Sequence, residues 1–199
     1  MIRKDGGPSW TVTITSDMAL NFALYVGCSY GFILEGTYSG QVPLWPYKQL
    51  GYYSDISLSR QWENWWTELI QKRDFNLSHD IMNPINELFN PPEFLDLKIE
   101  GLVGCCKEAW PLYSSWWDMP AGGRFAMAYW ESFTNVSQYV YKFEQVKGRK
   151  VKDFKLHIDL VYTGISERIE LRPEYVIMTL NPKHLKEEAW WMKKLQQIG

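Results

Sequence analysis

His157 and Asp159 are the residues whose types and spacing could most directly support chemistry. They lie two apart in residues 154–162, where apolar and polar residues alternate as in a strand with one buried face. Side chains two apart on a strand share a face, which a metal site or an acid–base pair would need. A metal also needs a third and usually a fourth ligand, and no other His has a suitable spacing. The pattern therefore favours polar residues on the solvated face of a half-exposed antiparallel strand.

Other nucleophiles and loops also lack the partners that catalysis needs. Cys105 and Cys106 are adjacent, but the sequence places no His beside them, so they are interpreted as small buried residues. Ser114 and Ser115 are not in a Gly-x-Ser-x-Gly motif. Residues 122–124 (GGR) lack the Lys-Ser/Thr of a phosphate-binding loop and favour a plain turn. We therefore expect a protein that is not an enzyme and has no metal site and no cofactor.

Aromatic residues are unusually abundant, with 11 Trp, 12 Tyr and 9 Phe among 199 residues. Three Trp doublets are hard to bury in one small domain, and Trp and Tyr are efficient anchors at binding surfaces. Residues 37–55 carry five aromatics without a helical period, and we interpret them as a long ordered loop. The alternative is that these rings turn back to cover the core. The aromatic residues predicted to contact a partner or ligand are Trp45, Tyr47, Tyr52, Tyr53, Trp116 and Trp117.

A basic cluster at residues 147–155 contains five cations, among them Arg149 and Lys150, which we count as candidate binding residues. Nucleic-acid binding would require exposed aromatics beside this cluster. A charged turn that keeps a sheet edge soluble is the plainer interpretation. An acidic protein partner would use the same cations.

Periodicity predicts a single α+β domain over residues 1–199, with an antiparallel sheet, a helical middle section and a C-terminal helix. The clearest element is an amphipathic helix over 58–72, with Trp62, Trp65 and Leu69 on its apolar face. Residues 125–133 fit a helix or a strand. Strands are predicted over 10–15, 21–26, 29–34, 138–146, 154–162, 167–171 and 175–180; further helices are predicted near 79–89, 92–97 and 101–110 and from 182 onward.

Composition narrows the possible partners and compartment. The net charge is −2, so nucleic acid is not an expected partner. No apolar run is long enough to span a membrane, and the first ten residues lack the apolar region of a signal peptide. Three Cys give no disulfide framework, which favours the reducing cytoplasm. Residues 1–141 carry a net charge of −6, whereas residues 142–199 carry +4.

These observations lead to three hypotheses about function. The first is a non-enzymatic binding protein that neutralises another protein, such as a toxin, as immunity proteins and antitoxins do. The second is a small-ligand or nucleotide-binding protein in which loop aromatics stack on a ring and Arg124, Arg149 or Lys150 meets a phosphate. The third is a hydrolase that uses His157 and Asp159.

Overall fold

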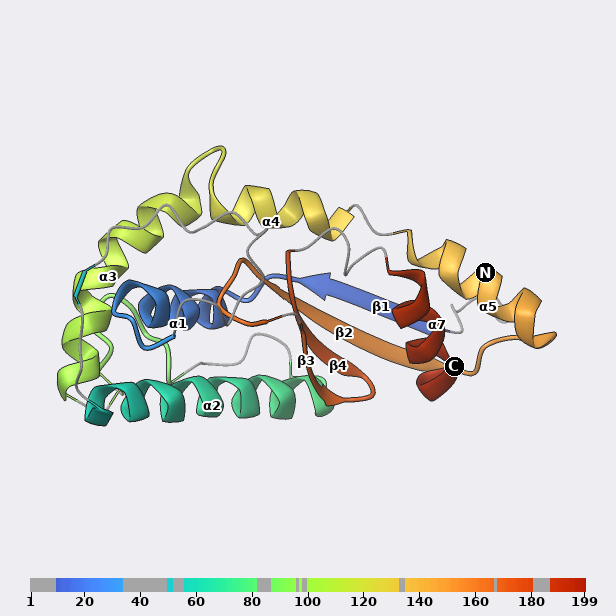
Figure 1. Cartoon of the computed structure of the whole chain (residues 1–199), viewed down its shortest axis with the longest axis horizontal. Helices are drawn as coiled ribbons and strands as arrows, with labels where there is room; N and C mark the ends of the chain where they lie inside the picture. The colour runs from blue at the N-terminus through green and yellow to red at the C-terminus, as the bar shows by residue number, and fades with distance from the viewer. Residues whose placement is uncertain are drawn as a thin grey trace.

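The computed structural model is a mixture of helices with one four-stranded sheet (Figure 1). It describes residues 10–33, 50–51, 56–81, 87–95, 97, 100–132, 135–166, 168–180 and 187–199. In chain order, the elements of this part of the chain are β1 (Trp10–Thr15), α1 (Met18–Ser29), α2 (Ile56–Ser78), α3 (Glu100–Asp118), α4 (Gly123–Ser132), α5 (Val136–Lys147), β2 (Phe154–Val161), β3 (Arg168–Arg172), β4 (Tyr175–Thr179) and α7 (Glu188–Ile198).

The sheet is mixed, with the strand order β1-β2-β4-β3. Strand β2 is parallel to both of its neighbours, β1 and β4, and only β3 and β4 form an antiparallel pair. The α+β class is thus confirmed in outline, but the prediction of an antiparallel sheet is wrong. The reason is that the long helical section between β1 and β2 acts as a crossover, which parallel strands require. The turn at Pro173 and Glu174 makes the one antiparallel hairpin.

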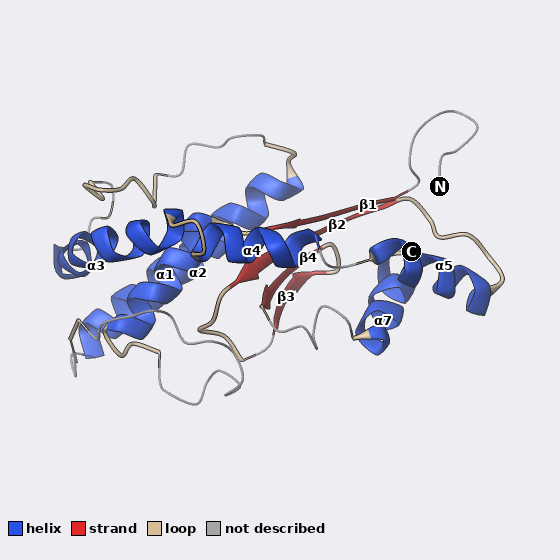
Figure 2. Cartoon of the chain, turned by 90° about the horizontal axis from the view of Figure 1, so that it is seen from above, coloured by secondary structure: helices blue, strands red, loops and turns tan. Residues whose placement is uncertain are grey.

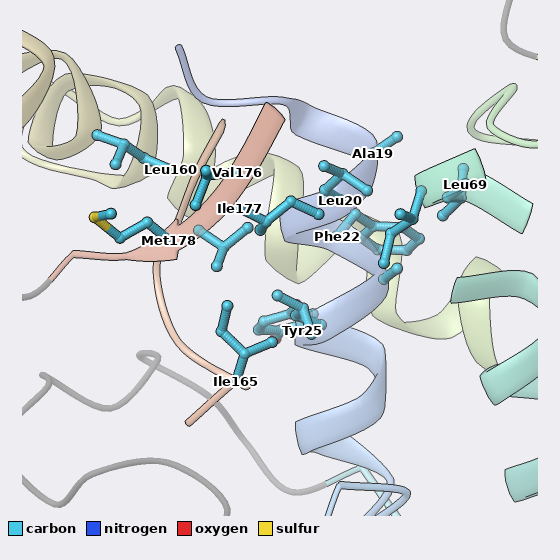
Figure 3. Packing of buried hydrophobic residues seen from close by; sticks show 14 of the residues in the cluster. Ala19, Leu20, Phe22, Tyr25, Leu69, Leu160, Ile165, Val176, Ile177 and Met178 are labelled. Atoms are coloured by element: carbon cyan, nitrogen blue, oxygen red, sulfur yellow. The ribbon is translucent and has the colours of Figure 1, made fainter. Parts of the chain in front are cut away.

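Helix α1 replaces the two strands predicted over 21–26 and 29–34. Ten of its twelve residues are buried, and a helix that is buried all round has no polar face to reveal its period. Asp17 begins it as the N-cap, accepting a hydrogen bond from the backbone N–H of Leu20 at 2.9 Å. Figure 3 shows Leu20 and Phe22 of this helix in one apolar cluster with Ile177 of β4 and Leu69 of α2.

Helix α2 confirms the prediction over 58–72 and extends it to Ser78. Helix α3 continues through Pro111, where we predicted an end. An interior proline costs about 3 kcal/mol, and burial of Tyr113 and Trp117 in the following turns offsets that cost. Helix α5 replaces the strand predicted over 138–146, because Val140 and Phe143 are buried at a helical spacing. The segment 92–97 forms turns in its described part.

The molecule is elongated (Figures 1 and 2). Helices α1, α2 and α3 extend beyond one end of the strands, and α5 and α7 lie near the other end. Helix α7 is tied to β3 by two bonds to Glu170, one from Trp190 Nε1 at 3.0 Å and one from Lys194 Nζ at 2.7 Å. No helix in the described residues is long and apolar enough to cross a membrane.

Asn21 joins the buried helix to the sheet. Its amide nitrogen donates to the carbonyl oxygens of Asp17 at 2.9 Å and Leu160 at 3.0 Å. Its amide oxygen accepts from the backbone N–H of Tyr162 at 2.9 Å. This one side chain therefore links the end of β2 to the first turn of α1.

We expect Asn21→Ala to lower the free energy of unfolding by about 2–4 kcal/mol, because it leaves buried backbone groups of Leu160 and Tyr162 without their partner. Chemical denaturation followed by circular dichroism measures this change. Asn64→Ala, at an exposed position of α2, is the control and is expected to be nearly neutral. Equal stability of the two variants would contradict the linking role of Asn21.

Candidate functional site

The aromatic residues predicted as a binding surface are only partly within the described structure. Trp45, Tyr47, Tyr52 and Tyr53 lie outside the described residues. Trp117 is only 4% exposed and stacks on Tyr113, with ring centroids 5.5 Å apart.

The predicted partner contact of Trp117 stays a prediction, and its side chain offers little accessible surface for it. Trp116 is half-buried against Tyr162. The nine Trp side chains that the structure describes are all buried or half-buried, so the doublets do not supply the expected surplus.

The predicted cations Arg149 and Lys150 lie in the turn between α5 and β2 and already hold that turn together. Arg149 Nη1 donates to the carbonyl oxygen of Gly199 at 2.9 Å, and its guanidinium lies over the ring of Phe143. Lys150 Nζ is 2.7 Å from Glu144 Oε2. These contacts agree with the interpretation as a charged turn, and Figure 1 places this turn far from α3.

Cys105 and Cys106 are buried, as predicted. Burial, together with the nearby Glu108 carboxylate, raises the pKa of the Cys105 thiol to about 11. Burial also raises the pKa of Cys106. A nucleophilic thiol needs a lowered pKa, and neither thiol has one.

The strongest candidate site surrounds His157 and Asp159. They share a face of β2, as their spacing predicted, and the register aligns Asp159 with Thr15 of β1 and His157 with Tyr175 of β4. Helix α2 reaches this face near its C-terminal end and contributes Arg73. The Asp159 side chain is fully buried and that of His157 is 16% exposed, so the interpretation as a solvated strand face is wrong.

The Asp159 carboxylate receives hydrogen bonds from three neighbouring side chains besides His157. Arg73 binds it through two atoms, Nε to Oδ2 at 2.9 Å and Nη2 to Oδ1 at 3.0 Å. Thr15 Oγ1 donates to Oδ1 at 2.8 Å, and the Tyr175 hydroxyl donates to Oδ2 at 2.9 Å. The two parallel hydrogen bonds between Arg73 and Asp159 are the strongest arrangement that Arg and a carboxylate form.

These contacts decide which groups near Asp159 can exchange a proton. Burial alone would raise the pKa of Asp159, but the hydrogen bonds from His157 and Arg73 and the charge of Arg73 hold it well below its usual value. Burial and the neighbouring Asp159 carboxylate raise the pKa of Tyr175. Asp159 therefore stays ionised and Tyr175 stays protonated near neutral pH, so neither serves as an acid or base there.

Asp17, the N-cap of α1, lies at the edge of this cluster, with Oδ2 3.7 Å from Arg73 Nε. Burial and the nearby Asp159 carboxylate raise its pKa, although Arg73 acts in the opposite direction. Asp17 and Asp159 thus both lie near the Arg73 guanidinium, but Arg73 forms its paired hydrogen bonds with Asp159.

His157 is oriented by the same cluster. Its Nε2 lies 3.1 Å from Asp159 Oδ1, 3.0 Å from Thr15 Oγ1 and 3.2 Å from Arg73 Nη2. The Asp159 carboxylate and the Thr15 hydroxyl are acceptors and favour the proton on Nε2, in which case the contact with Arg73 Nη2, a donor, is not a hydrogen bond. Nδ1 then carries a lone pair, and it makes no hydrogen bond with any described residue.

A groove of about 300 Å³ lies over His157. Thr11 and Thr13 of β1 supply hydroxyls to its wall, and Lys155 and Arg172 supply cations. The cations are paired at the rim, Lys155 with Asp80 at 2.8 Å and Arg172 with Asp74 of α2. The groove is also lined by Leu77, Ser78, Asp80, Leu156 and Glu174.

Sequence reasoning missed the residue that organises this site. The helix predicted over 58–72 ends one residue before Arg73. The alternation of Thr11, Thr13 and Thr15 with Trp10, Val12 and Ile14 was the available signal, since it predicts a polar face on β1 that in-register pairing brings beside His157 and Asp159.

Comparison with known proteins adds no assignment, because no family model, curated protein or solved structure matches the chain. Among the described residues, no group of three His, Cys, Asp or Glu side chains is placed to hold a metal ion. What the site can do must therefore be argued from its own geometry.

We expect Arg73→Met to lower the free energy of unfolding by about 3–5 kcal/mol, because it leaves the buried Asp159 carboxylate without its countercharge. Equilibrium denaturation at pH 7 measures the loss. Arg60→Met, on an exposed part of the same helix, controls for the change of side chain and is expected to be nearly neutral. A small effect at Arg73 would mean that the pair does not hold α2 to the sheet.

Asp159 also predicts a pH dependence. Its pKa is lower in the folded protein than in the unfolded chain, so its stabilisation is present above the unfolded pKa and declines as the pH falls below it. We expect Asp159→Asn to flatten the decline of the unfolding free energy between about pH 5 and pH 2, whatever its effect at pH 7. Asp118→Asn, at an exposed position, should retain the wild-type slope. An unchanged slope in Asp159→Asn would refute the assignment.

Proposed function

We propose that the protein binds a small anionic ligand, a carboxylate or a phosphate monoester, in the groove over His157. The observation that carries this proposal is a histidine in the groove lining whose Nε2 is held by a buried carboxylate and whose Nδ1 makes no hydrogen bond with a described residue. Lys155 and Arg172 also line the groove, and their charges suit an anionic group.

The hydroxyls of Thr11 and Thr13 suit the same class of ligand. Both residues are exposed on β1 and line the groove beside Lys155. A ligand oxygen could take hydrogen bonds from these hydroxyls while its charge faces the cations. Asp80 lies 2.8 Å from Lys155 at the rim, where both side chains are 75% exposed. Such an exposed ion pair contributes little free energy, so a ligand can displace Asp80 from Lys155 at little cost.

This proposal refines the second of the hypotheses drawn from the sequence. The loop aromatics that we expected to stack on a ring lie outside the described residues, so a nucleotide base has no assigned partner. The groove supports recognition of the anionic group instead. A hydrolase remains a third hypothesis, and in it neither Asp159 nor Tyr175 would exchange protons, because each is held in one protonation state.

Titration calorimetry with inorganic phosphate, AMP and acetate, with adenosine as the uncharged control, tests the proposal. We expect at least one of the anions to bind and adenosine not to bind. Lys155→Ala and His157→Gln should each weaken binding about tenfold, which corresponds to a loss of about 1.4 kcal/mol. Lys152→Ala, an exposed lysine that does not line the groove, should bind as the wild type does.

Two outcomes would overturn this proposal. One is that no anion binds the wild type, and the other is that the groove variants bind as well as Lys152→Ala does. Turnover of p-nitrophenyl phosphate or acetate that His157→Gln abolishes would replace ligand binding with the hydrolase hypothesis.

Neutralisation of a partner protein stays a second proposal, and one observation favours it. Tyr141 and Val146 of α5 are 63% and 65% exposed, although large apolar side chains are usually covered. They lie on the part of the chain with the positive net charge. Exposed side chains such as these, and not the described Trp residues, offer a protein partner uncovered apolar area.

A further inference from the structure

An apolar groove between α5 and α7 is separate from the His157 site. Its volume is about 520 Å³. Phe143 and Val146 of α5 and Met192 of α7 give it an apolar lining, Lys147 and Lys193 flank it, and Gln196 and Gln197 complete it. Phe143 is fully buried and forms the floor, whereas Val146 is exposed.

The two helices form a fixed frame for this groove. Tyr139 stacks on Trp191 with ring centroids 5.3 Å apart, and Lys142 forms an ion pair with Glu188. The groove is lined by the residues that follow these contacts in each helix. Because the frame is already packed, a ligand would meet a preformed surface and would not have to order it first.

The charge of the groove indicates the chemistry of its occupant. No acidic side chain among the described residues lines it, and neither Lys147 nor Lys193 forms an ion pair with any of them. The nearby Glu144 is already bound to Lys150 and to the backbone N–H of Val151. Two free cations beside an apolar strip complement a surface that is apolar in the middle and acidic at its sides.

We infer that this groove docks an acidic amphipathic helix of a partner protein. A third helix laid between α5 and α7 would place apolar residues spaced i, i+3 or i+4, and i+7 against Val146 and Met192, above the buried Phe143. Its Glu or Asp side chains would meet Lys147 and Lys193. The inference goes beyond the anionic-ligand proposal, and it gives the partner proposal a surface and a chemical class of partner.

Fluorescence anisotropy with two synthetic helical peptides tests this inference. Both carry the same leucines at i, i+3, i+4 and i+7; one has Glu at the flanking positions and the other has Lys. We expect the acidic peptide to bind the full-length protein at least tenfold more tightly than the basic peptide. Raising the salt concentration should weaken its binding, since the flanking contacts are solvent-exposed.

Variants of the full chain show whether the groove is the surface used. Val146→Asp should weaken binding of the acidic peptide at least tenfold, and Lys147→Glu with Lys193→Glu should reverse the preference between the two peptides. Lys152→Glu, an exposed site outside the groove, is the matched control, and thermal unfolding verifies that each variant is folded.

Three outcomes would overturn the inference. The first is equal binding of the two peptides, and the second is reversal of the preference by Lys152→Glu as well. The third is a wild-type dimer in light scattering that Val146→Asp converts to a monomer, because the occupant would then be a second copy of the chain. None of these outcomes bears on the His157 groove, so the two proposals fail separately.

Discussion

The ion pair between Arg73 and the buried Asp159 carboxylate is the constraint on which the rest of the site depends. An ionised carboxylate that is shielded from solvent must be paired and fully hydrogen-bonded, because otherwise the free-energy cost of burying its charge would strongly destabilise the fold. Asp159 receives these hydrogen bonds from three different elements, through Arg73 of α2, Thr15 of β1 and Tyr175 of β4. The end of α2 is thereby held against the polar face of the sheet, and His157 is held in the lining of a groove, where its Nδ1 makes no hydrogen bond with the described part of the chain.

The same junction organises the helical end of the molecule. Strand β1 leads directly into α1, whose N-cap Asp17 touches Arg73 and whose Asn21 closes the end of β2. Because α1 is buried on all sides, α2 and α3 must surround it, and their Trp side chains fill the remaining space. Trp62 Nε1 donates to the Ala23 carbonyl and Trp65 Nε1 to that of Leu88, so large rings are buried with their polar atoms satisfied.

Local patterns predicted the elements that have one polar face. Strand β1 and the first half of β2 alternate between apolar and polar residues, whereas β4 is a short apolar run that is buried throughout. The Trp62–Trp65–Leu69 face revealed α2. Helix α1 was missed because it has no polar face, and α5 because its alternating rings resembled a strand, although Asn135 and Gly148 are good caps. The His157–Asp159 pair was found from spacing alone. Arg73 could not be predicted as part of the site, because its helix is far away in the sequence and no local pattern shows that its side chain points toward a buried carboxylate.

A double-mutant cycle between Arg73 and Asp159 tests the central claim most directly. Unfolding free energies of the wild type, Arg73→Met, Asp159→Asn and the double variant at pH 7 give the coupling between the two side chains. The structure predicts a coupling energy of about 2 kcal/mol or more, with the double variant more stable than the sum of the two single losses implies. Additivity within about 0.5 kcal/mol would show that the two groups do not depend on each other, and would contradict the account of how His157 is held.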